Sequence, residues 1–360
     1  MDIRQEIEAL KARLRSYLET SPLWQTPLFP EHLNQAVRSY LLAGGKYLRP
    51  ALLLWSCRAL GGDENLALPA ALAVEVSHTW TLVHDDIIDR DETRRGRPSV
   101  HAEFQQKGGE QLGLGDYAAH YGQSLALLAG DVQHSWAVSL FTEAAALNGQ
   151  GADPRLVLGL VRELEADVMP KIISGEALDL QLSRRPLPEV AEAEVLRMVA
   201  DKTATLFSFC ARAGAHFAAG EYLPKAAPVN AMGDFGYHVG MAFQLQDDIL
   251  GLRGDPQELG KPVGSDLREG KRTVPLVFSW QHATPAARRH FEAVAGNAQA
   301  TEAELAEIKH LLENLGGIAH AQELARHHID HALANLKGVK PGPAKKLLEK
   351  LAHFALERTY

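Results

Sequence analysis

Apolar residues recur along this chain at steps of three and four positions, which is the spacing of one face of an α-helix. The pattern is clearest in five long stretches, Leu66 to Ile88, Gly122 to Leu147, Leu156 to Leu182, Val195 to Phe217 and Met232 to Leu252. Several of these are apolar around most of their circumference, which predicts helices buried between other helices. No stretch shows the alternation of polar and apolar residues that is typical of a half-buried β-strand. The chain is therefore predicted to be all-α.

Glycine and proline residues interrupt the helical pattern and divide it into roughly a dozen helices. The interruptions fall at Gly44-Gly45, Gly61-Gly62, Pro98, Gly108 to Gly115, Pro186 to Pro188, Gly220, Gly260 to Gly264, Gly316-Gly317 and Pro341 to Pro343. None of them is long, low in complexity or strongly charged, as a linker between domains would be. We therefore predict one domain over residues 1–360 and assign no role to the stretch from Gln105 to Tyr121.

The composition of the chain limits which partners it can bind and in which cellular compartment we expect it. The chain has 37 Lys and Arg against 45 Asp and Glu, a net charge of −8, which argues against general attraction to nucleic acid or to an anionic membrane. An anionic ligand would therefore need a local cluster of cations or bound metal ions. Cys57 and Cys210 are the only cysteines, which supports neither a disulfide framework nor a structural zinc site. Because no signal peptide and no run of ~18 uninterrupted apolar residues is found, we expect a cytoplasmic protein without a membrane span.

Three carboxylates end the first of the long apolar stretches: Asp85, Asp86 and Asp89. Helical spacing puts Asp85 and Asp89 on one face. Carboxylates so close repel one another, and at a helix C-terminus they also oppose the macrodipole. Divalent cations would remove both penalties, because carboxylate oxygens are ligands that Mg²⁺ prefers when it bridges a protein to substrate phosphates. The alternative interpretation is a solvated helix end.

A second acidic cluster comes late in another apolar stretch. It contains Asp247 and Asp248, with Gly251 where a third Asp would stand. Basic residues follow both clusters, in Arg90 to Pro98 and in Gly260 to Arg272. Arginine offers phosphate oxygens a planar fork and lysine offers them a mobile charge. One acidic cluster alone is more often a solvated surface, but two with basic residues after them predict metal ions that hold a phosphorylated ligand.

Seven motifs occur in order along the chain: GGKYLRP at 44–50, HDDIIDRDETRRG at 84–96, LLAGD at 127–131, GEALDLQ at 175–181, DKTATLF at 201–207, FQLQDDILGLRGD at 243–255 and GKPVGSD at 260–266. Together they resemble those of the trans-polyprenyl diphosphate synthase family, of farnesyl and geranylgeranyl type. The resemblance covers the chain from about residue 40 to its end. It implies the isoprenoid synthase fold, a large helical bundle around a central cavity, and a homodimer. The implied reaction condenses isopentenyl diphosphate with an allylic diphosphate.

The resemblance also implies which residues hold the metal ions and the allylic diphosphate. Both Asp-rich motifs would face the cavity and hold three Mg²⁺ through Asp85, Asp89 and Asp247, with Asp86 and Asp248 in supporting positions. The residues implied for the allylic substrate are Arg94, Lys202, Thr203, Gln244, Asp248, Lys261 and Lys271. The implied catalytic set is Asp85, Asp86, Asp89, Arg94, Lys202, Asp247 and Lys261.

Two positions depart from the most frequent family pattern. Gly251 removes a carboxylate from the second Asp-rich motif, as in a recognised subset of the family, so we do not expect it to inactivate the protein. Glu176 stands where many relatives carry Gln, which leaves its hydrogen-bonding role open.

The residues implied for isopentenyl diphosphate are Lys46, Arg49, His78 and Arg95. His78 lies seven residues before Asp85 and therefore on the same helical face. Without the motif, a lone His on an apolar helix would be interpreted as a core residue.

Product length depends in relatives on the residues four and five positions before the first Asp, which form part of the cavity floor. Here these are Thr81 and Trp80, with Ser77 one turn further back. Members with an aromatic residue at this position and no insertion in the first motif tend to make a twenty-carbon product, which favours geranylgeranyl diphosphate. The alternative is farnesyl diphosphate, because Trp is bulky.

Three other classes of protein compete with this interpretation. A class I terpene cyclase needs only one diphosphate, and the GGKYLRP motif and Arg95 argue against it. A non-catalytic partner subunit of a synthase would not need the intact cluster at Asp85, Asp86 and Asp89. A helical scaffold would need none of these clusters.

Overall fold

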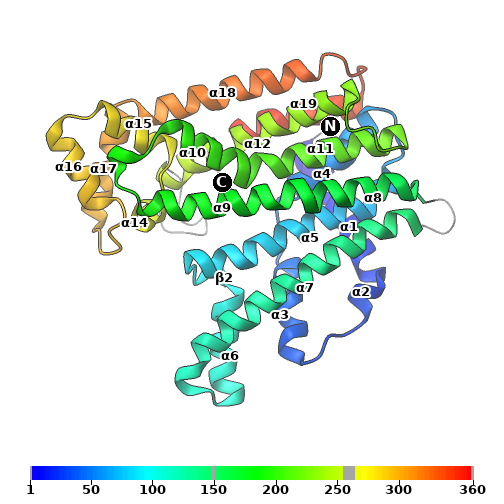
Figure 1. The fold of residues 1–360 in the computed structure, drawn as a ribbon, viewed down its shortest axis with the longest axis horizontal. Coiled ribbons are helices and arrows are strands. Elements are labelled where there is room, and N and C mark those ends of the chain that lie inside the picture. Colours follow the sequence, from blue (N-terminus) through cyan, green and yellow to red (C-terminus); the bar gives the residue numbers. More distant parts are fainter. Residues whose placement is uncertain (1, 147–150, 254–263, 358–360) are drawn as a thin grey trace. The chain divides into compact units, whose positions relative to one another are not determined.

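The computed structural model describes residues 2–146, 151–253 and 264–357, and these ranges are almost entirely helical (Figure 1). The chain forms two compact units. The first is Met1–Val161 with Ala213–Tyr222, and the second is Arg162–Arg212 with Leu223–Tyr360. The single domain expected from the sequence stays a prediction.

The elements up to residue 163 are α1 (Ile3–Thr20), α2 (Pro22–Gln25), α3 (Glu31–Leu42), α4 (Leu48–Ala59), α5 (Glu64–Asp89), β1 (Thr93–Arg94), β2 (Arg97–Pro98), α6 (Val100–Leu112), the 3₁₀ turn η1 (Gly115–Tyr117), α7 (Ala118–Ala146) and α8 (Pro154–Glu163). The later elements are the π-turn η2 (Leu164–Val168), α9 (Met169–Arg184), η3 (Leu187–Glu189), α10 (Glu192–Val199), the π-turn η4 (Ala200–Ala204), α11 (Thr205–Ala219), α12 (Ala227–Arg253), α14 (Ser265–Glu269), α15 (Val274–His282), α16 (Pro285–Val294), α17 (Glu302–Asn314), α18 (Gly317–Asn335) and α19 (Pro343–Glu357). The five helical stretches predicted from the apolar pattern are confirmed. Two of them, 156–182 and 195–217, each contain a π-turn.

The core of the first unit is built around α5, which packs against α4 and α7. Alanines on α5 are fully buried, Ala70, Ala71 and Ala73 among them, because small side chains let neighbouring helices approach closely. In the second unit α12 packs against α15, α18 and α19, and α9 packs against both π-turns.

The interruption predicted over Gly108 to Gly115 lies in the later part of that stretch. Helix α6 continues through Gly108 and ends at Gly113, which has a φ of 64°. A Cβ at Gly108 would lie 2.7 Å from the ring of Tyr121. The glycine therefore permits close packing on α7 and does not end the helix.

A short hairpin is the other departure from the sequence expectation, because no strand was predicted. Its strands β1 and β2 pair Thr93 with Pro98 and Arg94 with Arg97. The two-residue turn between them, Arg95-Gly96, has φ values of 54° and 72°. Positive φ at both positions is the geometry of a type I′ turn, which matches the twist of the flanking strands. Two-residue strands are too short to show an alternating pattern.

Helix α5 is also the one described helix that is long and apolar enough to cross a membrane by length and composition. Within its most apolar window 72% of the residues are buried inside the structure, as in the core helix of a globular protein. The absence of a membrane span stays a prediction.

Candidate active site

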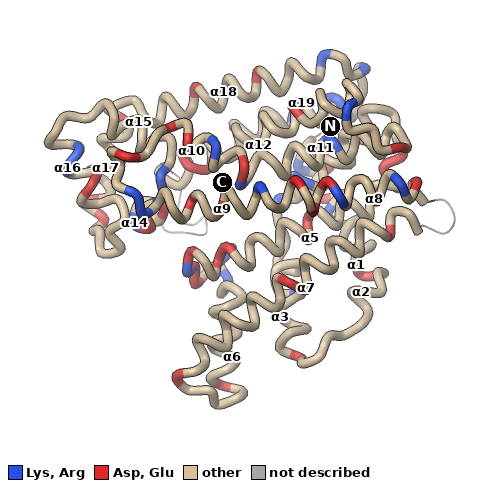
Figure 2. Tube along the Cα trace, viewed as in Figure 1, with Lys and Arg blue, Asp and Glu red and all other residues tan. Residues whose placement is uncertain are grey.

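The acidic end of α5 is followed by basic residues (Figure 2), and one of them, Arg94, lies close to it. Asp86 is buried and accepts hydrogen bonds from the hydroxyl of Tyr40 and from the guanidinium of Arg94. Arg94 also lies 3.7 Å from Asp85 Oδ2 and 3.6 Å from Asp91 Oδ2. Burial raises the pKa of Asp86, whereas Arg94 and Tyr40 oppose that rise. Arg94, which the sequence assigned to a diphosphate, thus pairs with Asp86 in this structure.

The hairpin separates the two neighbouring arginines. The sequence analysis treated Arg90 to Pro98 only as a basic stretch, without a turn. Arg94 belongs to β1, whereas Arg95 occupies the first left-handed position of the turn. Their side chains therefore leave the backbone in different directions, and only Arg94 reaches the acidic end of α5.

A second group of charged side chains in the first unit surrounds the backbone of Gly45. A Cβ at Gly45 would lie 3.2 Å from Arg95 Nη2 and 3.2 Å from Glu75 Oε1. Glu75 is buried, and burial raises its pKa while Arg49 and Arg95 lower it. Burial lowers the pKa of Arg95, and the nearby carboxylate of Glu75 opposes this effect.

His78, one turn after Glu75 on α5, is uncharged at neutral pH. Burial holds its pKa well below the usual range, and Arg49, Arg95 and Arg94 lower it further. It can therefore donate or accept a hydrogen bond but adds no positive charge. The structure brings Arg49, His78 and Arg95 into one electrostatic group. That these residues and Lys46 bind isopentenyl diphosphate stays a prediction.

Sequence reasoning missed Glu75. It is the only charged residue between Leu66 and Val83, in a stretch otherwise fit for a core helix. A buried carboxylate needs a cationic partner, so this lone acid could have been linked to the arginines of the neighbouring motifs.

The three residues implied for product length all lie on α5. Ser77 is buried, and the hydroxyl of Thr81 donates to the carbonyl of His78 at 2.8 Å. The Trp80 ring packs against His134 of α7, with ring centroids 4.8 Å apart. Trp80 also makes an edge contact with His84 at 5.7 Å.

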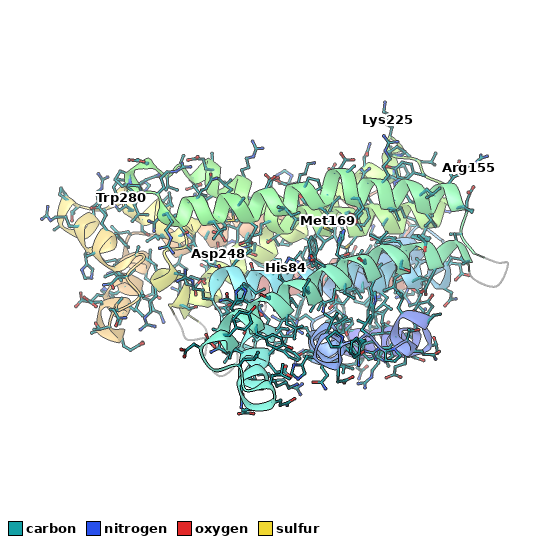
Figure 3. The ribbon with its side chains drawn as sticks, turned by 60° about the horizontal axis from the view of Figure 1, so that its bottom comes forward. His84, Arg155, Met169, Lys225, Asp248 and Trp280 are labelled. Atoms are coloured by element: carbon teal, nitrogen blue, oxygen red, sulfur yellow. The ribbon has the colours of Figure 1, made fainter. Side chains whose placement is uncertain are left out.

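The glycine of the LLAGD motif, Gly130, lies where α7 contacts His84 of α5. A Cβ at Gly130 would lie 2.2 Å from Nε2 of His84, and the same nitrogen lies 3.1 Å from the carbonyl oxygen of Leu127. His84 is labelled in Figure 3. Any larger residue at position 130 would displace this ring and with it the end of α5.

The second acidic cluster lies on α12 in the second unit, where Asp248 is labelled in Figure 3. Gln244 donates to Asp248 Oδ1 at 2.9 Å and accepts a hydrogen bond from the hydroxyl of Thr203 at 3.0 Å. Burial raises the pKa of Asp248 well above its usual range, and Asp266, Asp247 and Asp179 raise it further. Thr203 and Gln244 are thus brought together with Asp248, and their role in substrate binding stays a prediction.

Gly251, where the sequence lacks a third Asp, lies beside another carboxylate. A Cβ at this position would be 2.9 Å from Asp266 Oδ2. Asp266 comes from α14, so an acid distant in the sequence occupies the space next to the missing one. The sequence analysis named neither Asp266 nor Asp179 as a candidate, because helical spacing relates only residues of one element.

Lys202 lies in the π-turn η4, which packs closely on α9. A Cβ at Gly175 would lie 2.4 Å from the backbone nitrogen of Lys202. Lys202 Nζ lies 2.7 Å from Glu176 Oε2 and 2.8 Å from Asp179 Oδ2. π-turns often occur at functional sites. The question left open for Glu176 is answered in part, since its carboxylate pairs with Lys202.

The last two lysines of the predicted site are placed differently. Lys261 lies outside the described residues. Lys271 lies near Glu269, with 3.6 Å between Nζ and Oε2.

The donor sets fit a hard divalent cation. Asp85, Asp89 and Asp247 offer carboxylate oxygens, which Mg²⁺ prefers. Within residues 2–146, 151–253 and 264–357, no three His, Cys, Asp or Glu side chains converge as a complete metal site. Mg²⁺ commonly keeps several waters and takes only one or two carboxylates, so such sparse protein ligation is compatible with it.

A family model described as Polyprenyl synthetase matches residues 30–312. The chain belongs to the polyprenyl synthetase family. A short chain isoprenyl diphosphate synthase from Methanothermobacter thermautotrophicus is 35% identical over 331 residues, which cover 92% of each chain. A (2E,6E)-farnesyl diphosphate synthase from Mycobacterium tuberculosis is 37% identical and covers 76% of this chain and 68% of its own.

A solved structure of another polyprenyl synthetase agrees with the fold. It is a geranylgeranyl pyrophosphate synthase from Corynebacterium glutamicum, complexed with isoprenyl diphosphate and magnesium. It matches with a TM-score of 0.86 at 28% identity and covers 99% of this chain and 100% of that one. The all-α isoprenoid synthase fold expected from the sequence is confirmed, and so is an enzyme of isoprenoid biosynthesis that transfers prenyl groups.

Proposed function

We propose that this polyprenyl synthetase condenses isopentenyl diphosphate with short allylic diphosphates and releases geranylgeranyl diphosphate. The observation that supports the proposal is that the first unit holds two different charged groups. One is the acidic end of α5, which suits a metal-bound diphosphate, and the other is the cationic group around Gly45. Two substrates with the same headgroup need two such ways of binding it.

For the first substrate, we assign the metal ions to Asp85, Asp89 and Asp247, with Asp86 and Asp248 beside them. When bound, Mg²⁺ neutralises the charge that develops on the leaving diphosphate. Three ions are proposed, as the family resemblance implies. The residues proposed to bind the allylic diphosphate are Arg94, Lys202, Thr203, Gln244, Asp248, Lys261 and Lys271. Arg94 and Lys202 are held by carboxylates in this structure, so each has to exchange a carboxylate for phosphate oxygens.

The second substrate is proposed to bind where Arg49 and Arg95 approach Glu75. Lys46, Arg49 and Arg95 supply the charge that the diphosphate of isopentenyl diphosphate requires, and His78 supplies a neutral hydrogen-bonding group. Glu75 holds the arginines in orientation before the ligand arrives. The backbone of Gly45 can approach the ligand because it has no side chain.

Product analysis tests this function. The protein with Mg²⁺ and isopentenyl diphosphate is given dimethylallyl, geranyl or farnesyl diphosphate in turn, and the products are separated by chromatography. We expect chain extension from all three, ending at twenty carbons. Cleavage of an allylic diphosphate without consumption of isopentenyl diphosphate would instead indicate a cyclase, and no turnover at all would indicate a non-catalytic subunit.

The twenty-carbon product is proposed on the position of Trp80, which lies against His134 one turn beneath the acidic cluster. Farnesyl diphosphate is the second candidate, because the bulk of the same ring favours a shallower cavity. Trp80→Ala should lengthen the products, whereas Thr81→Phe should shorten them to fifteen carbons or fewer. If Trp80 serves only as packing, its truncation will cost about 3–5 kcal/mol of stability with no change of product. Melting temperature and product length measured on the same variant distinguish the two outcomes.

We further propose a cytoplasmic homodimer. Leu127 and Leu128 on α7 are each 50% exposed, which supports an apolar contact surface on that helix. Cys57 and Cys210 are buried free thiols, which suits a reducing compartment.

A further inference from the structure

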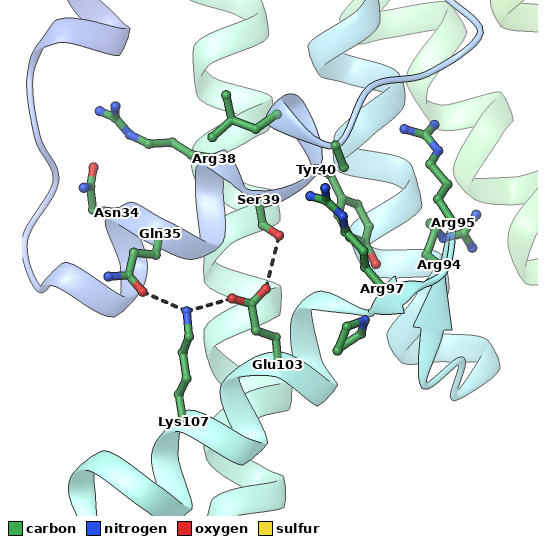
Figure 4. Close-up of a pocket in the computed structure, with 13 residues that line it drawn as sticks. Asn34, Gln35, Arg38, Ser39, Tyr40, Arg94, Arg95, Arg97, Glu103 and Lys107 are labelled. Atoms are coloured by element: carbon green, nitrogen blue, oxygen red, sulfur yellow. Dashed lines mark hydrogen bonds and ion pairs between the residues drawn. The ribbon is translucent and has the colours of Figure 1, made fainter. Parts of the chain in front are cut away.

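A cavity of about 580 Å³ opens in the first unit between α3, the hairpin and α6 (Figure 4). A volume of this size is typical of sites for small molecules. Arg38 from α3, Arg97 from β2 and Lys107 from α6 reach it from three elements. Of the residues in its wall, only Arg94 and Arg95 belong to the proposed substrate sites.

Two of the three cations are fixed in position. The guanidinium of Arg38 stacks on the ring of Trp24 at 4.4 Å and donates to the carbonyl of the same residue at 2.7 Å. Lys107 Nζ lies 2.7 Å from Glu103 and donates to Gln35 Oε1 at 2.9 Å (Figure 4). A cation that is already oriented loses little entropy when an anion binds.

The positive charge in the cavity is only partly neutralised. Glu103 is the one carboxylate in its wall, and it already pairs with Lys107 and accepts a hydrogen bond from Ser39 at 3.3 Å. The side chain of Arg97 is exposed and has no hydrogen bond or ion pair with the residues that the structure describes. Five cations line the wall. Arg94 pairs with Asp86, and Arg95 lies near Glu75. The other three, Arg38, Arg97 and Lys107, therefore face one carboxylate, in a chain whose net charge is −8.

We propose that this cavity is a third diphosphate site, separate from the two substrate sites, whose occupant restrains the hairpin. Arginine and lysine together suit a group with two phosphates. Leu42, which is 51% exposed, and Pro98 give the wall an apolar part that suits a prenyl tail. Inorganic diphosphate and a prenyl diphosphate share the headgroup that the three cations recognise.

Restraint of the hairpin would reach the substrate sites through the backbone. Arg97 pairs with Arg94 across the two strands, and Arg94 contacts Asp86. Arg95, in the turn, lies against Gly45. A ligand that holds Arg97 therefore limits the movement of both Arg94 and Arg95. Binding in this cavity would let reaction products regulate the enzyme, a role that goes beyond the proposed function.

Calorimetry tests the proposal without turnover. The full-length protein is titrated with inorganic diphosphate in EDTA, which removes metal-dependent binding, and with saturating isopentenyl diphosphate, which occupies the second substrate site. We expect one remaining site, weakened at least tenfold by Arg97→Gln and by Lys107→Gln. Arg155→Gln is the matched control, because Arg155 is exposed on α8 of the same unit and points outward in Figure 3.

Geranylgeranyl diphosphate in the same buffer distinguishes the two sources of the headgroup. Tighter binding than inorganic diphosphate, lost in Leu42→Ser, would identify a prenyl ligand; equal binding would identify the headgroup alone. Diphosphate affinity that is unchanged in both Arg97→Gln and Lys107→Gln overturns the proposal. If the wild-type protein shows no turnover but Arg97→Gln still weakens diphosphate binding, the result would support the proposed third site and contradict only the proposed synthase activity.

Discussion

Helices α5 and α12 both end in acidic clusters, but they balance their buried groups in opposite ways. On α5, Asp86 pairs with Arg94, and Glu75 lies near Arg49 and Arg95. The buried charges of α5 are therefore compensated by cations of the same unit, which is the condition for burying them without a large penalty.

On α12, by contrast, the carboxylate of Asp248 lies near other carboxylates. Asp248 bonds to the neutral amide of Gln244, and three further carboxylates raise its pKa. One of them, Asp179, shares Lys202 with Glu176, so one lysine serves two acids there. The comparison teaches that the α5 cluster is stable as it stands, whereas the α12 cluster gains more from an added cation.

The largest effect is expected at the acidic cluster of α5. Asp85→Ala and Asp89→Ala should each lower kcat about a thousandfold with the fold intact, because each removes a carboxylate that we propose binds a catalytic Mg²⁺ and neither removes a core contact. Steady-state kinetics with both substrates and circular dichroism check this. Asp116→Ala, at an exposed Asp of η1, is the control. Unchanged turnover in these variants would contradict the assignment of Asp85 and Asp89 as metal ligands.

Stability should separate the two clusters. Asp86→Asn should lower the free energy of unfolding by about 3 kcal/mol, because it leaves the guanidinium of Arg94 without its closest carboxylate. Asp248→Asn should raise stability by about 1 kcal/mol, because it removes a buried charge from among like charges. Urea unfolding in EDTA measures both, with Asp116→Asn as the control. Changes of the same sign in both variants would contradict the comparison.

Much of this could be predicted from the sequence. The five long helices follow from apolar spacing because burial on a helix repeats with its turn. Asp85 and Asp89 lie on one helix, as predicted, because helical spacing fixes which residues of an element are neighbours.

The remaining features depend on contacts between elements, which spacing does not reveal. The pairing of Arg94 with Asp86 requires the hairpin, whose two-residue strands carry no periodicity. Asp266 approaches Gly251 from another helix, and Gly108 is explained only by the ring of Tyr121. Sequence reasoning therefore proposed candidate ligands but did not find their partners in the ligand-free protein.

The compensated charges of α5 also predict a division between the substrates. Arg95→Gln should raise KM for isopentenyl diphosphate about thirtyfold, the effect of losing about 2 kcal/mol of charge-assisted hydrogen bonding. Arg94→Gln should act mainly on the allylic substrate, because Arg94 lies at the acidic end of α5 and Arg95 at Gly45. Initial rates with each substrate varied in turn measure the two effects. Equal changes in both KM values would show that the hairpin acts as one unit.

The smallest effect concerns a second group of like side chains on α12. His238 Nδ1 lies 2.8 Å from His328 Nδ1 of α18, and the ring of His331 stacks on His238 with centroids 5.1 Å apart. Burial lowers the pKa of His328 to about 4 from 6.5, and His238, His331 and His327 lower it further. Burial and His331 also lower the pKa of His238, which Asp234 opposes.

Because the folded protein resists protonation of His328 more than the unfolded chain does, acid should destabilise it. This contribution to stability is present above pH 6.5 and is lost as the pH falls towards about 4. After allowance for partial exposure the loss is about 1 kcal/mol, or roughly 2–4 °C in Tm. Melting curves between pH 7.5 and 4.5 should therefore fall less steeply for His328→Gln than for the wild type, whereas His353→Gln, at an exposed position of α19, should follow the wild type. If the melting temperature of His328→Gln depends on pH as the wild type does, other groups cause the acid sensitivity. The carboxylates around Asp248 and the histidines around His238 would then be alike in their arrangement but not in their effect on stability.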